Sequence, residues 1–319
     1  MSNDALVSRL GQINQTGDAK ALFLKVFAGE VLTSFEKQNV MMDKHMVRTI
    51  THGKSAQFPV MGRAGAYYHA PGEFIPGGQL KHAERIITID DLLISPSFIA
   101  NIDEAMNHYD VRSVYSKEQG MQLANTMDKH ILQVGVQAAR ATKTIDDADQ
   151  FGGSQVFGVD PTNGEELADA MFEAAKLLDQ KDVPADGRYM FVRPAEFYAM
   201  AQTTKILNRD WGGEGSYAGG NVIRVAGITI VKTNNLPGTV VANGTLAAGT
   251  GNKYAGNYSD TVGLVMHPYA VGTVKLMDLG MEGEYQINRQ GWLLVAKYAV
   301  GHGILRPDCA VEISKAVAP

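Results

Sequence analysis

The sequence predicts an α+β fold with long, extended elements, and three observations support this prediction. Residues 101–140 contain no proline and carry apolar residues at helical spacing. Two β-like runs within residues 46–94 enclose a tract rich in glycine and proline. Strand-like segments return after residue 261, beyond a stretch in which helical and strand patterns alternate. We therefore expect one long helix, one long hairpin, a compact domain and a set of returning strands.

The composition is that of a globular protein. The chain has 319 residues, of which 45% are hydrophobic and 20% are charged, so it is long enough for two packed units. The net charge of −5 and the lack of any long basic run exclude dedicated nucleic-acid binding as the main activity. The single cysteine, Cys309, excludes an internal disulfide and is expected to be a small buried residue. With no signal-like or bilayer-length stretch, we expect a soluble protein without a membrane partner.

Residues 1–45 are predicted to form an N-terminal arm. The first 17 residues are polar, and residues 19–37 then carry apolar side chains at helical spacing. A short amphipathic helix behind a polar leader has little of its own chain to pack on. Its partner surface is therefore expected on another subunit, with these contact candidates: Phe23, Phe27 and Phe35.

Residues 46–94 are predicted to form an extended loop built as a long β-hairpin, with strands at 46–51 and 85–93. An isolated two-stranded hairpin is marginally stable in water, so this element also needs a neighbour. The candidates for contact with another subunit are Lys54, Gln57, Phe58, Tyr67, Tyr68 and Glu73. The candidate bending points are the glycines Gly62, Gly65, Gly77 and Gly78.

Residues 101–140 are predicted to form a spine helix about 60 Å long. Asn101 can cap its start, and Gly120 and Gly135 each weaken it by about 1 kcal/mol relative to alanine. Polar residues at 112–119 interrupt any heptad stripe, which excludes a coiled coil. The returning strands are expected to cover the helix instead.

A polar, glycine-containing break at residues 142–154 predicts a domain boundary. Beyond it, Thr162 and Glu165 have the spacing of a capping box before an apolar helical stripe. Pro194 suits the first turn of a second helix, and strand patterns flank it on both sides. This part of the chain is predicted to be a compact α+β domain.

Signals of catalysis, cofactor binding or metal binding are weak. The glycine-rich residues 211–215 follow a helical pattern and lack the lysine of a phosphate-binding loop. Residues 108–110 point in different directions on a helix, and the aspartates of 146–149 lack the remaining ligands of a calcium loop. We expect no catalytic, cofactor-binding or metal-binding residues. A pH-sensitive interface stays open for the histidines His45, His52, His69 and His82.

Ordered stretches at both ends of the chain resemble one known family. Residues 103–113 read DEAMNHYDVRS, and further matches lie at 22–27, 29–33, 53–60, 70–73, 87–90, 270–276, 296–303 and 305–307. Together they resemble the major capsid protein of short-tailed podoviruses of the autographivirus group. Between residues 141 and 260 the match is one of element order.

The resemblance implies a Hong Kong 97-like phage capsid fold. Residues 1–45 would be its N-terminal arm and residues 46–94 its extended loop. Residues 95–144 and 261–319 would form the peripheral domain with the spine helix, and residues 145–260 the axial domain. Lys–Asn crosslinks, known for part of this fold class, are not expected, because no motif here matches them.

The resemblance also implies a function. The chain would self-assemble into hexamers and pentamers of an icosahedral shell around a double-stranded DNA phage genome, and it would take part in procapsid maturation. Its partners would be other copies of itself, a scaffolding protein, a portal, a decoration protein and weakly bound DNA. It would be a virion component assembled in the bacterial host cytoplasm, without enzyme activity. Two alternatives are a cargo-holding nanocompartment of the same fold and an α+β enzyme using the loop at 211–220.

Overall fold

The computed structural model describes residues 40–75, 77–101, 112–147, 150–203, 224–242 and 252–318. The chain divides into two compact units. Of the described residues, 90–101, 112–127 and 277–300 belong to the first unit, and the others belong to the second. The predicted arm helix lies outside the described residues.

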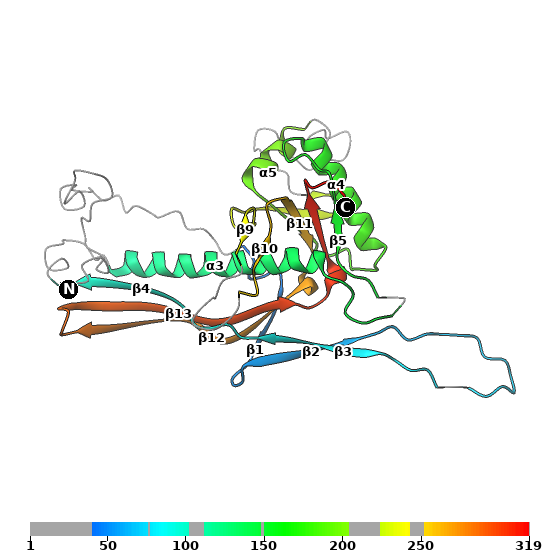
Figure 1. Cartoon of the computed structure of the whole chain (residues 1–319), viewed down its shortest axis with the longest axis horizontal. Coiled ribbons are helices and arrows are strands. Elements are labelled where there is room, and N and C mark those ends of the chain that lie inside the picture. The colour runs from blue at the N-terminus through cyan, green and yellow to red at the C-terminus, as the bar shows by residue number, and fades with distance from the viewer. Residues whose placement is uncertain are drawn as a thin grey trace. The chain divides into compact units, whose positions relative to one another are not determined.

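In the first unit, a helix packs on long strands. Strand β4 (Leu93–Ala100) pairs antiparallel with β13 (Gly291–Ile304), which is hydrogen-bonded to β12 (Val271–Gln286). The first part of α3 (Arg112–Arg140) lies along these strands (Figure 1). Gln119 Nε2 donates to Ser97 Oγ on β4 (2.8 Å) and to the Leu294 carbonyl on β13 (3.3 Å). The returning strands therefore cover this part of the helix, as the sequence predicted.

The second part of α3 packs against the sheet of the second unit. Helix α3 is observed from Arg112, and residues 102–111 of the predicted spine are outside the described part. A Cβ atom at Gly135 would lie 2.6 Å from Leu264 Cδ2 on strand β11 (Thr261–Met266). Gly135 was expected only to weaken the helix, but its missing side chain is what allows this close approach.

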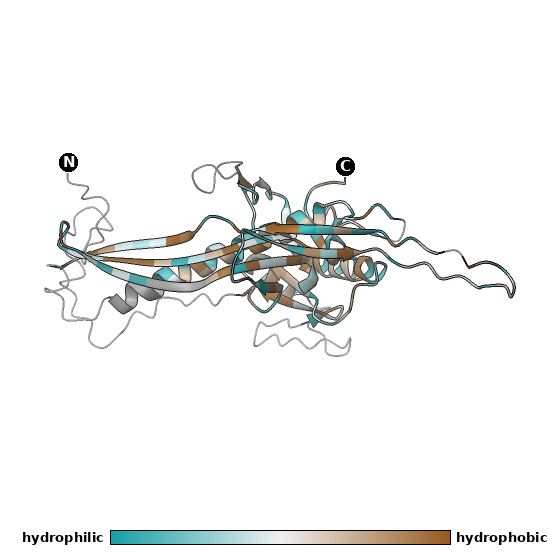
Figure 2. Ribbon diagram, turned by 90° about the horizontal axis from the view of Figure 1, so that it is seen from below, coloured by the Kyte–Doolittle hydropathy of each residue, from teal (hydrophilic) through white to brown (hydrophobic). Residues whose placement is uncertain are grey.

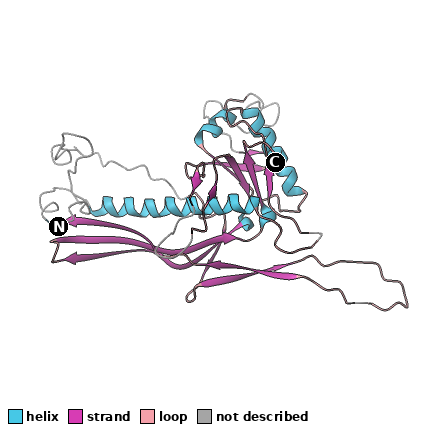
Figure 3. Ribbon diagram, viewed as in Figure 1, coloured by secondary structure: helices cyan, strands magenta, loops and turns pink. Residues whose placement is uncertain are grey.

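The second unit is built on a six-stranded sheet with the order β5-β14-β11-β6-β8-β7. All six residues of β11 are buried. Helices α4 (Gly164–Asp179) and α5 (Pro194–Ala201) belong to this unit. Figure 3 draws helices in cyan and strands in magenta. The other strands are β5 (Ser154–Val156), β6 (Tyr189–Val192), β7 (Arg224–Val225), β8 (Ile228–Lys232) and β14 (Ala310–Ser314). A separate pair joins β9 (Val240–Val241) and β10 (Gly256–Asn257), and two short 3₁₀ turns are η3 (Pro268–Ala270) and η4 (Pro307–Cys309).

The predicted cap of α4 is wrong by one residue. Asn163 is the N-cap, and its side-chain oxygen accepts a hydrogen bond from the Glu165 amide (3.1 Å). The Thr162 hydroxyl, which was expected to cap the helix, donates instead to Asp160 Oδ1 (2.8 Å) in a local turn. Glu166 completes the reciprocal contact by accepting from Asn163 Nδ2 (2.9 Å).

The hairpin is formed by strands β2 (Ser55–Met61) and β3 (His82–Thr88), which pair antiparallel over their whole length. The prediction that 46–51 would be one of its strands is wrong, because β1 (Met46–Thr49) pairs in parallel with β12. The register between β2 and β3 places their buried apolar side chains opposite each other. Ala56 lies opposite Ile87, and both side chains belong to one small apolar core.

Cys309 is fully buried, as predicted. Burial, together with the neighbouring Asp308 carboxylate, raises the pKa of its thiol to about 12. Because only the thiolate reacts with disulfide reagents, we expect no reaction with Ellman's reagent at about pH 8 in the native chain and one thiol per chain after denaturation. Rapid reaction of the native chain would contradict this assignment.

Candidate self-assembly surface

The base of the hairpin is fixed against its own unit by close backbone packing. Ala56 and Ile87 form a small core with Val274 of β12 and Leu305. A Cβ atom at Gly301 of β13 would overlap the Thr88 carbonyl oxygen, so only glycine allows the strand to approach here. The base of the hairpin is therefore held in place by close packing against its own unit.

Polar contacts extend this support to β3 and to the first loop residues beyond the strands. In each, a basic side chain binds another part of the same unit: Arg63 Nη1 to Asp182 Oδ2 (2.9 Å), Lys81 Nζ to the Asp146 carbonyl (2.7 Å), and Arg85 Nη2 to Thr144 Oγ1 (3.0 Å). An exposed ion pair such as Arg63–Asp182 contributes at most about 1 kcal/mol. These contacts support the part of the hairpin nearest the unit and leave the loop between Arg63 and Lys81 uncovered by them.

Beyond the paired strands, the loop formed by residues 62–75 and 77–81 projects from the hairpin (Figure 1). Apolar and polar residues are interspersed along it (Figure 2). Four of its large apolar side chains are more than half exposed: Tyr67 (60%), Tyr68 (105%), Phe74 (89%) and Ile75 (62%). We call these four residues the tip cluster. Exposed apolar groups gathered on one projecting element are typical of a protein–protein contact surface.

The structure places the predicted contact residues in different surroundings. Lys54, Gln57 and Glu73 are exposed. Phe58 is half-buried, with the Arg48 guanidinium 5.5 Å from its ring centroid. Tyr67 and Tyr68 belong to the tip cluster, whereas Phe23, Phe27 and Phe35 lie outside the described residues. The roles of all nine stay predictions. Sequence reasoning missed Phe74 and Ile75, although two large apolar residues in a glycine- and proline-rich tract were a usable signal.

The predicted bending points also differ from one another. The Gly62 amide donates to the Lys81 carbonyl (2.9 Å), so the backbone pairing continues past Met61. A Cβ atom added at Gly65, Gly77 or Gly78 would meet no other atom within 4 Å. Their bending stays a prediction.

Residues that suggested other chemistry are engaged elsewhere or lie outside the described part. The loop at 211–220 and residues 108–110 are not among the described residues. Asp146 pairs with Lys143 (2.6 Å), which lowers the pKa of that carboxyl. Within the described residues no three histidine, cysteine or acidic side chains are placed to hold a metal ion. None of the described helices combines the length and apolarity needed to cross a bilayer.

A long helix covered by strands, an extended hairpin with an exposed tip and a compact α+β sheet define a subunit of the Hong Kong 97-like phage capsid fold. The profile of the Gp10A-like major capsid protein family matches residues 57–314. The chain therefore belongs to the Gp10A-like family of major capsid proteins.

Individual relatives agree with this assignment. The chain is 37% identical over 318 residues to the major capsid protein of Escherichia phage T7, with 92% of each chain covered. It is 36% identical over 329 residues to the major capsid protein of Enterobacteria phage T3, covering 95% of this chain and 94% of that protein. The capsid structure of Cyanophage P-SCSP1u superimposes with a TM-score of 0.83 at 45% identity, over 98% of each chain. The protein is thus a phage capsid component that forms an icosahedral shell, and its family is structural rather than enzymatic.

Proposed function

We propose that the hairpin joins copies of this chain, and that its tip cluster lies against a neighbouring copy. The exposure of Tyr67, Tyr68, Phe74 and Ile75 carries this proposal. Burying each such side chain contributes about 1.5–3 kcal/mol. Because the tip projects beyond the packed base of the hairpin, its apolar surface can contact a neighbour while the core of the subunit stays intact.

One tip contact does not hold a shell by itself. Association costs about 4–15 kcal/mol in lost translational and rotational freedom, which is comparable to the whole gain from the cluster. Head-to-tail contacts that close under rotation give each subunit two such contacts, one donated and one received. We therefore propose closed hexamers and pentamers, in which many moderate contacts also allow misplaced copies to dissociate.

The domain roles follow the same proposal. Residues 1–45 act as the arm, 46–94 as the extended loop, 95–144 with 261–319 as the peripheral domain, and 145–260 as the axial domain. The β2–β3 hairpin falls within the second range. Strands β11 and β14 complete the six-stranded sheet of the axial range although they follow residue 260, so the sheet spans that boundary.

The proposed partners beyond other copies are double-stranded DNA, a scaffolding protein, a portal and a decoration protein, with assembly in the bacterial host cytoplasm and later maturation of the procapsid. The net charge of −5 supports weak, non-specific contact with packaged DNA, because strong attraction would hinder its movement.

Electron microscopy of the purified full-length chain tests the proposal. We expect closed particles, and particles taken from infected cells should contain DNA that resists nuclease until the shell is opened. A protein cargo in place of DNA would favour a nanocompartment. A stable monomer that forms no rings or shells at any concentration would contradict the proposal.

A further inference from the structure

Three histidines from distant parts of the sequence lie together near the base of the hairpin. His45 precedes β1, His130 is on α3, and His302 is on β13. The His130 ring stacks on Tyr254 with centroids 4.1 Å apart, and its centroid is 6.4 Å from that of His302. His302 Nδ1 lies 2.8 Å from the Thr273 hydroxyl. We call His45, His130 and His302 the histidine cluster.

Two of these imidazoles are poorly prepared to carry a proton. His45 and His302 are 7% and 2% exposed, and in each the Nε2 atom is buried without a hydrogen-bond partner. His45 Nδ1 lies 2.6 Å from the Met41 carbonyl, which identifies that nitrogen as the donor. Protonation of Nε2 would place a new N–H and a positive charge in a site with no acceptor for it.

The charges around the cluster strengthen this effect. Burial is the main cause that holds the pKa of His302 well below its usual value, and nearby Lys253, together with His45 and His130 when they are protonated, lowers it further. Burial also lowers the pKa of His45, and the hydrogen bond to the Met41 carbonyl and the Asp43 carboxylate oppose that shift only in part. The charges that act on His302 therefore favour its neutral form.

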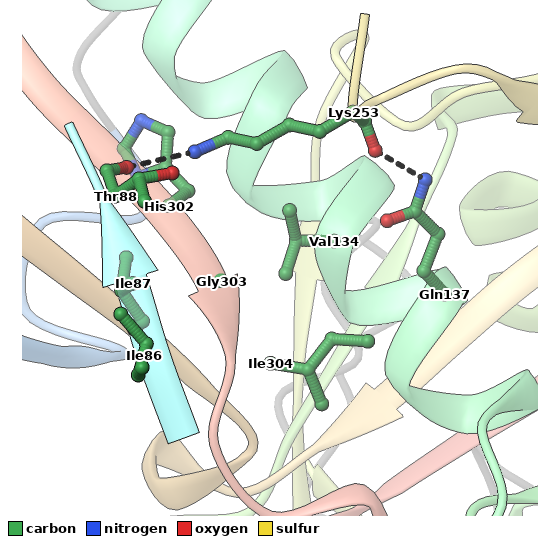
Figure 4. A pocket seen from close by; sticks show the side chains of 9 residues that line it. All are labelled: Ile86, Ile87, Thr88, Val134, Gln137, Lys253, His302, Gly303 and Ile304. Carbon is green, nitrogen blue, oxygen red and sulfur yellow. Dashed lines mark hydrogen bonds between the residues drawn. The ribbon is translucent and has the colours of Figure 1, made fainter. Parts of the chain in front are cut away.

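The cluster adjoins the contact that ties the hairpin to the helix. A cavity of about 180 Å³ lies between β3, α3, β13 and the segment that precedes β10. Lys253 Nζ reaches along it to donate to the Thr88 carbonyl at the end of β3 (3.1 Å), with His302 beside this contact (Figure 4). Gln137 Nε2 of α3 donates to the Lys253 carbonyl (3.0 Å). Lys253 thus connects the hairpin base to the helix.

We propose that the histidine cluster is an acid-sensitive latch, in which protonation of His45 and His302 releases the segment at residues 40–45 and the base of the hairpin from α3. The latch is a property of the single chain. Its use, to let the hairpin pivot between neighbouring copies, rests on the function proposed above.

The direction of the pH effect follows from the protonation states. In the closed form the two buried imidazoles bind fewer protons than in the opened form, where histidine titrates near 6.5. The latch is therefore fully closed above about pH 6.5 and weakens as the pH falls below that value. Each unit by which the closed form lowers an imidazole pKa makes acid opening about tenfold more favourable.

One carboxyl on the same helix acts in the opposite direction. Asp128 Oδ2 accepts from the Val40 amide (3.0 Å), and burial raises the pKa of this carboxyl to about 6. Lys44 is the positive charge that acts on it. Below about pH 6 the closed form gains a proton here, which strengthens closure. Burial lowers the pKa of His302 well below its usual value, and the lowered pKa of His45 acts in the same direction, so we expect acid to open the latch on balance.

Hydrogen exchange measured by mass spectrometry on the full-length chain at about pH 7.5 and about pH 5.5 tests the latch, after correction for intrinsic rates. We expect acid to reduce protection at residues 40–50, 86–89 and 252–256 but not in β6 or β11. His302→Gln should reduce the acid-induced loss of protection by about tenfold or more. His45→Gln should also reduce the acid-induced loss of protection, and it replaces His302→Gln as the test variant if that variant does not fold.

His82→Gln, at an exposed position on β3, is the matched control and should respond to acid like the unaltered chain. Asp128→Asn should open more readily in acid, since it removes the opposing carboxyl. Equal protection at both pH values, or an acid response unchanged in both cluster variants, would overturn the latch. A failure of shell assembly is seen separately by electron microscopy, because the exchange experiment reports on the chain whether or not it assembles.

Discussion

Replacing Arg140 with methionine is expected to lower the unfolding free energy by about 3–5 kcal/mol. Arg140 lies at the end of α3 and binds Glu312 of β14 with two contacts, Nε to Oε2 (2.6 Å) and Nη2 to Oε1 (2.5 Å). The Glu312 side chain is completely buried. Without the guanidinium, the donors left to its carboxylate among the described residues would be the neutral groups of Gln155 and Thr261. A buried charge left in that state is strongly destabilising, whereas total stability is only about 5–15 kcal/mol.

Substitution of the other partner, Glu312, should lower the unfolding free energy by a smaller amount. Glu312→Gln leaves Arg140 with a side chain that is 32% exposed and still donates to the Asn257 carbonyl, so water can solvate the remaining charge. We expect a loss of about 1–3 kcal/mol. The double variant should lose less than the sum of the two, because the second change removes the charge that the first leaves unpaired.

Urea denaturation of the unassembled chain, followed by tryptophan fluorescence, measures these differences. Lys176→Met is the matched control, since Lys176 forms an exposed ion pair with Glu173 (3.0 Å) and should lose at most about 1 kcal/mol. If Arg140→Met were no more destabilising than this control, the buried pair would not be a main support of the junction between α3 and β14.

The elements that sequence reasoning found are those with a local signal. The apolar stripe of α4 and the long helical pattern of α3 depend on neighbours three and four residues apart, and both helices are present. The hairpin was predicted in the correct region. Its first strand was misplaced because β2 lies inside the glycine- and proline-rich tract, where Pro59 weakens the strand pattern.

What sequence reasoning could not find depends on distant partners. Met46 pairs with Gly272, and no local pattern records a contact over that separation. The histidine cluster has the same origin: His45 was a candidate for pH sensitivity, but His130 and His302 reach it only through the fold. At the hairpin tip, by contrast, the exposure of Tyr67 and Tyr68 could be predicted, because a loop this rich in glycine and proline does not pack on itself.

Replacing residues 62–81 with Asn-Gly is expected to leave a folded, soluble subunit that forms no closed particles. Met61 and His82 are the last paired residues of β2 and β3, so a two-residue turn joins them without changing the register. The core at the hairpin base, with Ala56 and Ile87, is untouched. The change removes the tip cluster, together with the exposed contacts of Arg63 and Lys81. At each proposed contact with a neighbour, losing the cluster removes about 1.5–3 kcal/mol of burial for each apolar side chain.

Two further variants separate the tip cluster from loop length and from exposed apolar area in general. Tyr68→Ser combined with Phe74→Ser keeps the whole loop and should greatly reduce particle yield. Phe172→Ser removes an aromatic side chain that is 58% exposed on α4 and should leave assembly near normal. Electron microscopy counts particles, and the urea midpoint shows that each subunit is folded. Because the joining energy is expected to reside in the tip, a normal yield of closed particles from the shortened chain would assign the contact between copies to another element.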